Sequence, residues 1–140
     1  MRSNIQSGEG FFALLVTGDG LPMDTVSELL ALTPTRTVRK GDLLNRLPEI
    51  RAERDEWILR MPLTTPLATD SALNNLLSHL NRRQAQLTQV TGLGEVTLRL
   101  SVQSDTAQMT YRLMPQTLTG LAELGLPLEV SSVSWGEVGI

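Results

Sequence analysis

The clearest pattern in the chain is a strict alternation of apolar and polar residues at positions 95–103, where every second residue is apolar. Successive side chains of a strand point to opposite faces of a sheet, so this pattern predicts a strand with one buried and one solvated face. A second alternation covers residues 107–113, after turn residues at 104–106. We therefore predict a β-hairpin over residues 95–113.

An unbroken apolar run at residues 11–16 predicts a strand that is covered on both faces and therefore central in the sheet. Further strands are predicted at residues 55–61, around Trp57, and at about 128–134. The turn residues 18–20, which read Gly-Asp-Gly, end the first strand.

Three segments carry apolar residues at helical spacing. The first lies between Pro22 and Pro34, and the longest covers about residues 70–90. The apolar stripe of the longest helix consists of Leu73, Leu76, Leu77, Leu80, Leu87 and Val90. The third helix begins at Pro115 and ends near Gly125. Its inward positions are predicted to be Leu118, Leu121, Ala122 and Leu124.

The order of these elements is β-α-β-α-β-β-α-β, which predicts an α+β fold with a mixed, mostly antiparallel sheet and helices on one face. Residues 1–10 are expected to form a flexible N-terminal arm, and residues 11–140 a single domain. Residues 33–54 show no regular period and are interpreted as an ordered connection. Its apolar anchors, spaced loosely enough for a helical turn, are Leu43, Leu44, Leu47 and Ile50.

Composition narrows the function classes. The chain has 140 residues, of which 41% are hydrophobic and 19% charged, enough apolar side chain for a core. It has no cysteine, which excludes disulfides, thiolate zinc sites, iron–sulfur clusters and cysteine nucleophiles. The first ten residues are polar, and the longest apolar run is too short to span a bilayer. We expect a cytoplasmic protein that does not associate with a membrane.

Charge is unevenly distributed. The net charge is −3, yet six of the 12 basic residues fall within positions 36–54. These six are Arg36, Arg39, Lys40, Arg46, Arg51 and Arg54. Acidic residues are interleaved with them, and no aromatic residue occurs between position 36 and Trp57. The segment is therefore either a solvated, self-paired loop or a binding surface for an acidic partner.

No catalytic constellation is visible in the sequence. The single histidine, His79, has no evident partner, so we assign it a structural or solvated role. The glycine turn at 18–20 lacks the residues of a phosphate-binding loop. We predict no catalytic residues, no metal site and no cofactor.

The candidate binding residues are Arg36, Arg39, Lys40, Asp42 and Trp57. In the functional interpretation, the loop presents its basic side chains to a ligand. In the structural interpretation, which we favour, Gly41 takes a positive φ and Asp42 hydrogen-bonds the backbone two residues on.

Several pieces of the chain together resemble an uncharacterised bacterial family, the domain-of-unknown-function family number forty-two seventy-nine. They are Leu-Ala-Leu-Thr-Pro-Thr at 30–35, Arg-Lys-Gly-Asp at 39–42, Trp57 in a strand, the Leu-rich helix and hairpin, and Leu-Ala-Glu-Leu-Gly at 121–125. The resemblance covers nearly the whole chain and implies a small α+β fold. Some members look like immunity proteins that neutralise toxins. The chain departs from the family pattern after residue 130, where members tend to end in an apolar, aromatic strand.

Three functional hypotheses stay open. The first, which we favour, is a non-enzymatic protein-binding domain, of the immunity type that the resemblance implies, with a partner that presents an acidic surface. The second is a small-ligand-binding domain or enzyme that uses the basic loop 36–42. The third is weak nucleic-acid binding, which the net negative charge disfavours. A homodimer through an exposed sheet edge is a further hypothesis.

Overall fold

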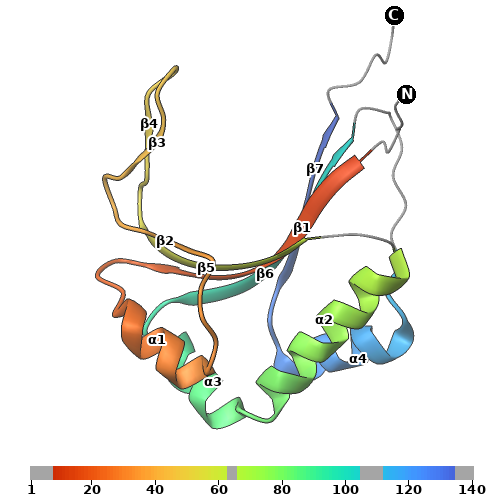
Figure 1. The fold of residues 1–140 in the computed structure, drawn as a ribbon. Coiled ribbons are helices and arrows are strands. Elements are labelled where there is room, and N and C mark those ends of the chain that lie inside the picture. The colour runs from red at the N-terminus through yellow and green to blue at the C-terminus, as the bar shows by residue number, and fades with distance from the viewer. Residues whose placement is uncertain (1–7, 63–65, 105–111, 135–140) are drawn as a thin grey trace, which may run out of the picture.

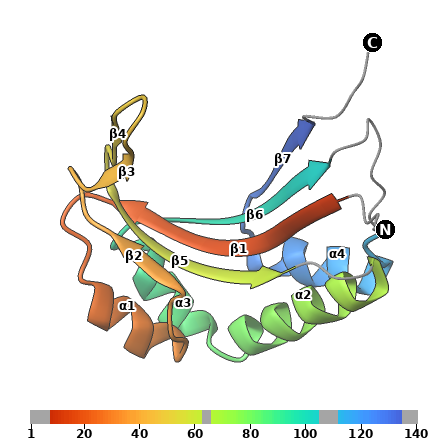
Figure 2. The ribbon, with the colours of Figure 1, turned by 45° about the horizontal axis from the view of Figure 1, so that its top comes forward.

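The computed structural model describes residues 8–62, 66–104 and 112–134, which form one curved sheet with helices on one of its faces (Figures 1 and 2). The elements are β1 (Gly8–Gly18), α1 (Met23–Leu30), β2 (Arg36–Val38), β3 (Leu43–Asn45), β4 (Ile50–Arg51), β5 (Asp55–Pro62), α2 (Pro66–Asn81), α3 (Gln84–Thr91), β6 (Glu95–Ser104), α4 (Pro115–Leu124) and β7 (Leu128–Ser134). The α+β class and the single helical layer are confirmed. None of the described helices is both long and apolar enough to cross a membrane.

The main sheet has the strand order β2-β5-β1-β6-β7. β1 is central, as its apolar run predicts, and pairs antiparallel with both β5 and β6. β7 runs parallel to β6, so the sheet is mixed. β1 begins at Gly8, so residues 8–10 belong to the sheet instead of the predicted arm. Residues 1–7 lie outside the described part of the chain.

The hairpin predicted over residues 95–113 is wrong in its pairing. β6 forms as expected, but one of its edges pairs with β1 and the other with β7. No edge of β6 is left for a hairpin partner between residues 98 and 104. Residues 112–114 lead into α4 without forming a strand, and residues 105–111 lie outside the described part. Alternation of apolar and polar residues predicts a strand but does not identify the strand that pairs with it. Here β7, a parallel strand from the C-terminal end, occupies the edge of β6 that we assigned to the hairpin partner.

The long helix predicted for residues 70–90 is two helices, α2 and α3, with a break at Arg82 and Arg83. Near this break, two side chains hydrogen-bond to the carboxyl end of α1. The Arg83 Nε donates to the Leu29 carbonyl at 3.0 Å, and the His79 Nε2 lies 2.8 Å from the Leu30 carbonyl. The last carbonyls of a helix have no partner within that helix, so both contacts satisfy α1. His79 thus has the structural role that we expected.

The core lies between the sheet and the helices. The residues buried there include the whole predicted stripe of α2 and α3, together with Phe12, Leu14 and Val16 of β1 and Val96, Leu98 and Leu100 of β6. In α4, Leu121 is buried, but Leu118 and Ala122, predicted to face inward, are exposed. Thr117 occupies an inward position instead, with only 1% of its surface exposed.

The face of the sheet without helices, which we call the helix-free face, carries a second, smaller cluster. Its buried members are Ala13, Leu15, Val38, Ala52 and Ile58. Ala52 follows β4 in the chain, so the base of the β3–β4 hairpin packs on this face.

The segment 33–54 contains three short strands and no helical turn. β2 pairs with β5, whereas β3 and β4 pair only with each other and project from the sheet on the side away from the helices (Figure 2). The four residues predicted as apolar anchors all lie on this projecting hairpin and are exposed. The anchor prediction is therefore wrong: the segment is ordered through polar contacts at its base, described next.

Candidate functional site

Trp57, one of the five candidate binding residues, belongs to the core. It lies on β5 with its side chain toward the helices and has no exposed surface. Its indole Nε1 donates to the Ser27 Oγ of α1 at 2.9 Å. A buried indole N–H requires an acceptor, and Ser27 supplies it. Trp57 thus joins β5 to α1 and does not contact a ligand at the surface.

Asp55, a residue that we did not consider as a candidate, organises the base of the segment. Its carboxylate is buried and accepts three hydrogen bonds from two other loops. The Leu21 amide donates to Oδ2 at 2.9 Å, the Lys40 amide donates to Oδ1 at 2.8 Å, and the Arg39 Nη1 donates to Oδ2 at 2.9 Å. The same Arg39 nitrogen also donates to the Leu21 carbonyl at 2.8 Å. We call these groups the Asp55 network.

This network lowers the pKa of the Asp55 carboxyl below its ordinary value of 3.8. The largest cause is the hydrogen bond from the Lys40 amide, and the Leu21 amide and the Arg39 guanidinium lower the pKa further. Burial acts in the opposite direction because it disfavours the charged form. The carboxylate is therefore ionised at neutral pH, and its charge is matched by Arg39.

The turn at residues 39–42 is explained by its own geometry. Gly41 has a φ of 93°, a conformation that side-chain-bearing residues rarely adopt. The Asp42 Oδ2 accepts the Arg39 amide at 2.8 Å, and the Arg51 Nη1 donates to the Gly41 carbonyl at 3.0 Å. Gly41 thus has the turn role that the structural interpretation assigned to it, whereas Asp42 closes the turn by bonding back to Arg39 and not to the backbone two residues on.

The five candidate residues do not converge on one cavity. Arg39 lines a hollow of about 440 Å³ at the start of α1, beside Asp24 and Thr37. Arg36, Lys40 and Asp42 do not line this hollow, and their side chains are exposed. The loop therefore offers this hollow a single guanidinium, that of Arg39, which already hydrogen-bonds within the chain, and it does not form a basic pocket.

The β3–β4 hairpin is the surface that the sequence interpretation missed. Its apolar side chains have exposed fractions of 41% for Leu43, 43% for Leu44, 90% for Leu47 and 47% for Ile50. Two basic residues nearby are paired, Arg51 with Glu49 at 2.9 Å and Arg54 with Glu95 at 3.7 Å. We call residues 43–51 the apolar hairpin. The signal available in the sequence was the group of four apolar residues around Pro48, for which no further helix or strand was predicted as a cover.

Two further arginines that the sequence did not single out lie on the helix-free face. Arg60 and Arg99 flank Ala13 in the register of β5, β1 and β6. The Arg60 guanidinium lies over the Phe11 ring, 4.4 Å from its centre, and Arg99 donates from Nε and Nη2 to the Glu129 Oε1. Arg36 lies opposite Ile58 on the same face. Arg36 and Arg60 thus add positive charge to the helix-free face.

The described residues hold no group of three or more histidine, cysteine, aspartate or glutamate residues that would fit a metal ion. Residues 9–134 match the family described as Domain of unknown function (DUF4279). The chain belongs to this family. No curated protein and no solved structure matches the chain.

The residues that carry the resemblance to DUF4279 hold this fold together. Arg39, Gly41 and Asp42 build the turn and the Asp55 network, and Trp57 links β5 to α1. Their side chains are thus occupied by contacts within this DUF4279 chain.

Proposed function

We propose that this DUF4279 chain is a non-enzymatic protein-binding domain that contacts its partner through the apolar hairpin. The observation that carries the proposal is the exposure of its four large apolar residues, led by Leu47 at 90%. Single exposed apolar residues are ordinary, but a cluster on a projecting element is typical of an interaction site. The hairpin also packs only its base, through Ala52, on the sheet.

The interface extends beyond the hairpin in this proposal. A specific interface covers about 800 Å² of each partner, more than two short strands offer. The hairpin projects on the side of the helix-free face (Figure 1), so in this proposal a partner bound to the hairpin also contacts this face. Arg36 and Arg60 lie there, and both are exposed. The partner is therefore expected to present an apolar patch with acidic residues around it.

The narrower form of the proposal is an immunity-type inhibitor, in which the partner is a toxin and binding takes place in the cytoplasm. It is supported by the resemblance of some family members to immunity proteins. It also agrees with the rigid anchoring of the hairpin base, because inhibitors of enzymes generally bind with little change of shape.

Capture experiments with matched variants test the general proposal. The chain is immobilised in wild-type form and as Leu47→Ser, and the control is Leu118→Ser on α4, which removes an exposed leucine from the helical layer. We expect a stoichiometric partner that wild type and control retain, with the affinity of Leu47→Ser reduced about tenfold or more. Equal retention by all three proteins, or no partner at all, would contradict the proposal.

Salt dependence tests the acidic character of the partner. Exposed charge pairs are screened by salt, so the association rate should fall as ionic strength rises, and Arg60→Ser should reduce this dependence. An association rate that is independent of salt would contradict an acidic partner.

The toxin form is tested by growth. Cells that express a toxin encoded beside this chain should survive with wild type or Leu118→Ser but not with Leu47→Ser. The competing homodimer hypothesis is tested by sedimentation of the purified chain. A dimer that Leu47→Ser dissociates would show that the apolar hairpin contacts a second copy of the chain instead of a different protein.

A further inference from the structure

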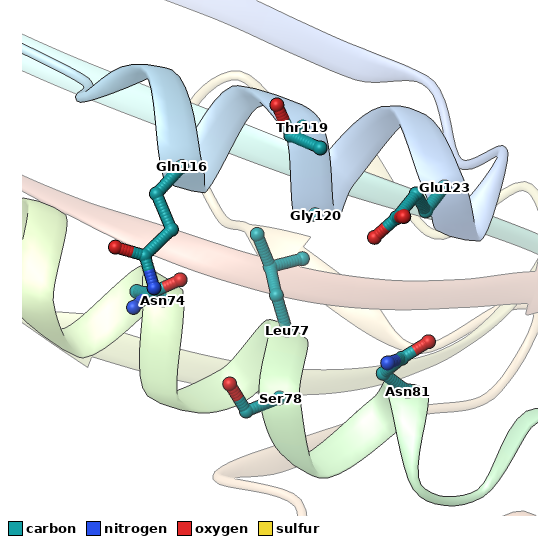
Figure 3. Close-up of a pocket in the computed structure, with 8 residues that line it drawn as sticks. All are labelled: Asn74, Leu77, Ser78, Asn81, Gln116, Thr119, Gly120 and Glu123. Carbon is teal, nitrogen blue, oxygen red and sulfur yellow. The ribbon is translucent and has the colours of Figure 1, made fainter.

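A second surface, on the opposite side of the molecule from the apolar hairpin, has the chemistry of a binding groove. A groove of about 290 Å³ runs between α2 and α4 (Figure 3). Its polar walls consist of Asn74, Ser78 and Asn81 from α2 and Gln116, Thr119 and Glu123 from α4. Five of these six side chains are uncharged, and among the described residues four of them, Asn74, Ser78, Gln116 and Thr119, make no side-chain hydrogen bond.

The two helices run in the same direction along the groove, since Gln116 faces Asn74 at one end and Glu123 faces Asn81 at the other (Figure 3). Their spacing is fixed at the start of α4, where the buried Asp70 Oδ1 accepts the Met114 amide at 2.8 Å. Leu77, which is buried, forms the floor. The groove is therefore a defined part of the fold.

Gly120 lies in the middle of the groove wall, and the fold itself does not require a glycine there. A Cβ at this position would meet Leu77 at 3.6 Å, an ordinary van der Waals distance. Glycine in a helix interior is less favourable than alanine because it loses more conformational freedom on folding. Because the glycine lacks this Cβ, a methyl-sized open space remains beside the Leu77 floor, where a ligand can approach the α4 backbone closely.

The groove continues past Glu123 into a second hollow of about 330 Å³ between α3 and the end of α4. Glu123 lines both hollows, and Gln84 of the second hollow donates from Nε2 to the Asn81 Oδ1 of the first. From Gln116 to Leu124 the helix rises about 12 Å, the length of about four residues of extended peptide. The two hollows thus fit an elongated ligand better than a compact one.

We propose that this groove binds an extended peptide segment that carries a basic group near Glu123. Side-chain amides and hydroxyls can both donate and accept hydrogen bonds, which suits the alternating N–H and C=O groups of a peptide backbone. Glu123 is the carboxylate shared by the two hollows, so a lysine, an arginine or a terminal ammonium meets it there. The proposal does not depend on the apolar hairpin.

Amide chemical shifts of the labelled chain, followed during titration with acetylated tetrapeptide amides, test this proposal. The probes are an alanine tetrapeptide with one lysine, the same peptide with one glutamate, and glucose as a compact hydrogen-bonding solute. We expect the lysine peptide to shift the amides of Ser78, Gly120 and Glu123 at millimolar concentration, and to bind at least threefold more tightly than the glutamate peptide. Glu123→Gln should abolish this difference.

Gly120→Ala separates a binding role from a packing role. Because the new methyl group fits, the variant should melt about 3 °C higher than wild type, while the lysine peptide should bind roughly fivefold more weakly. The control is Ala122→Gly on the exposed side of α4, which should lower the melting temperature and leave peptide binding unchanged.

Three results would overturn the proposal: no shifts with the lysine peptide, equal binding of the lysine and glutamate peptides, or groove shifts with glucose but not with peptide. A fall in the melting temperature of Gly120→Ala would show that packing requires the glycine, which would remove the argument from open space.

Discussion

Two adjacent stretches of the chain use polar and apolar residues in opposite ways. At residues 39–42, the buried carboxylate of Asp55 pairs with the Arg39 guanidinium and accepts the Lys40 backbone amide. At residues 43–51, apolar side chains are directed into solvent. In the first stretch polar residues bond within the fold, and in the second apolar residues stay exposed, which is the basis of our proposal that they contact a partner.

The comparison shows that much of the clustered charge in residues 36–54 is used within the fold. The basic residues of 36–54 first suggested a binding loop, but Arg39, Arg51 and Arg54 are all paired within the chain. A buried carboxylate requires partners because an unpaired buried charge is costly. Asp55 therefore holds the Arg39 guanidinium in a pair within the chain. Leu47 has no such requirement, and its exposure is a stronger argument for the proposed contact surface than the basic residues are.

The largest expected effect comes from Trp57, which lies beneath this region in the core. Trp57→Ala should reduce the free energy of unfolding by about 3–5 kcal/mol, because it leaves a cavity and removes the bond to Ser27. Urea denaturation measures the change. Trp57→Phe, which retains most of the apolar surface, should cost less. A loss below about 1 kcal/mol for Trp57→Ala would contradict a core role.

Asp55→Asn should have the next largest effect, and the effect should depend on pH. The pKa of Asp55 is lower in the folded protein than in the unfolded chain, so its carboxylate stabilises the fold above about pH 4. That stabilisation is lost as pH falls through the folded-state pKa. The variant should therefore be less stable than wild type at pH 7, and the difference should narrow below about pH 4.

Denaturant unfolding across this pH range measures the difference. The control is Asp19→Asn, which changes an exposed aspartate in the turn after β1 and should follow wild type at every pH. A difference between Asp55→Asn and wild type that stays constant down to pH 2 would show that the carboxylate charge is not what stabilises the network.

The smallest expected effect on stability belongs to Leu47→Ser on the apolar hairpin. With 90% of its surface exposed, Leu47 contributes little to the packed fold, so the free energy of unfolding should change by less than about 0.5 kcal/mol. Thermal and urea unfolding measure it. A loss comparable to that of Trp57→Ala would show that the hairpin is packed in solution, contrary to our account.

Residues whose environment is set by local pattern were predicted well from the sequence. The central position of β1, the stripe of α2 and α3, and the positive φ of Gly41 and Gly125 follow from apolar runs, helical spacing and turn chemistry. These features depend on neighbours close in the chain.

Features that depend on distant partners were not predicted. The parallel pairing of β6 with β7 joins residues about thirty positions apart, and nothing in the alternation of β6 indicates it. The break between α2 and α3 lies beside contacts with α1 some fifty residues earlier. Asp55 was not among the candidate residues, because its partners at Leu21 and Lys40 are brought together by the fold alone.

Amide hydrogen exchange of the isolated chain tests the contrast between the two stretches most directly. The account predicts that the amides of Leu21 and Lys40, which donate to Asp55, exchange as slowly as those of β1, while the amides of Leu44 and Arg46 on the hairpin exchange rapidly. If Lys40 exchanged as rapidly as the hairpin, the loop 39–42 would be free of the Asp55 network. Its basic side chains would then be available to a ligand, and the account would be wrong.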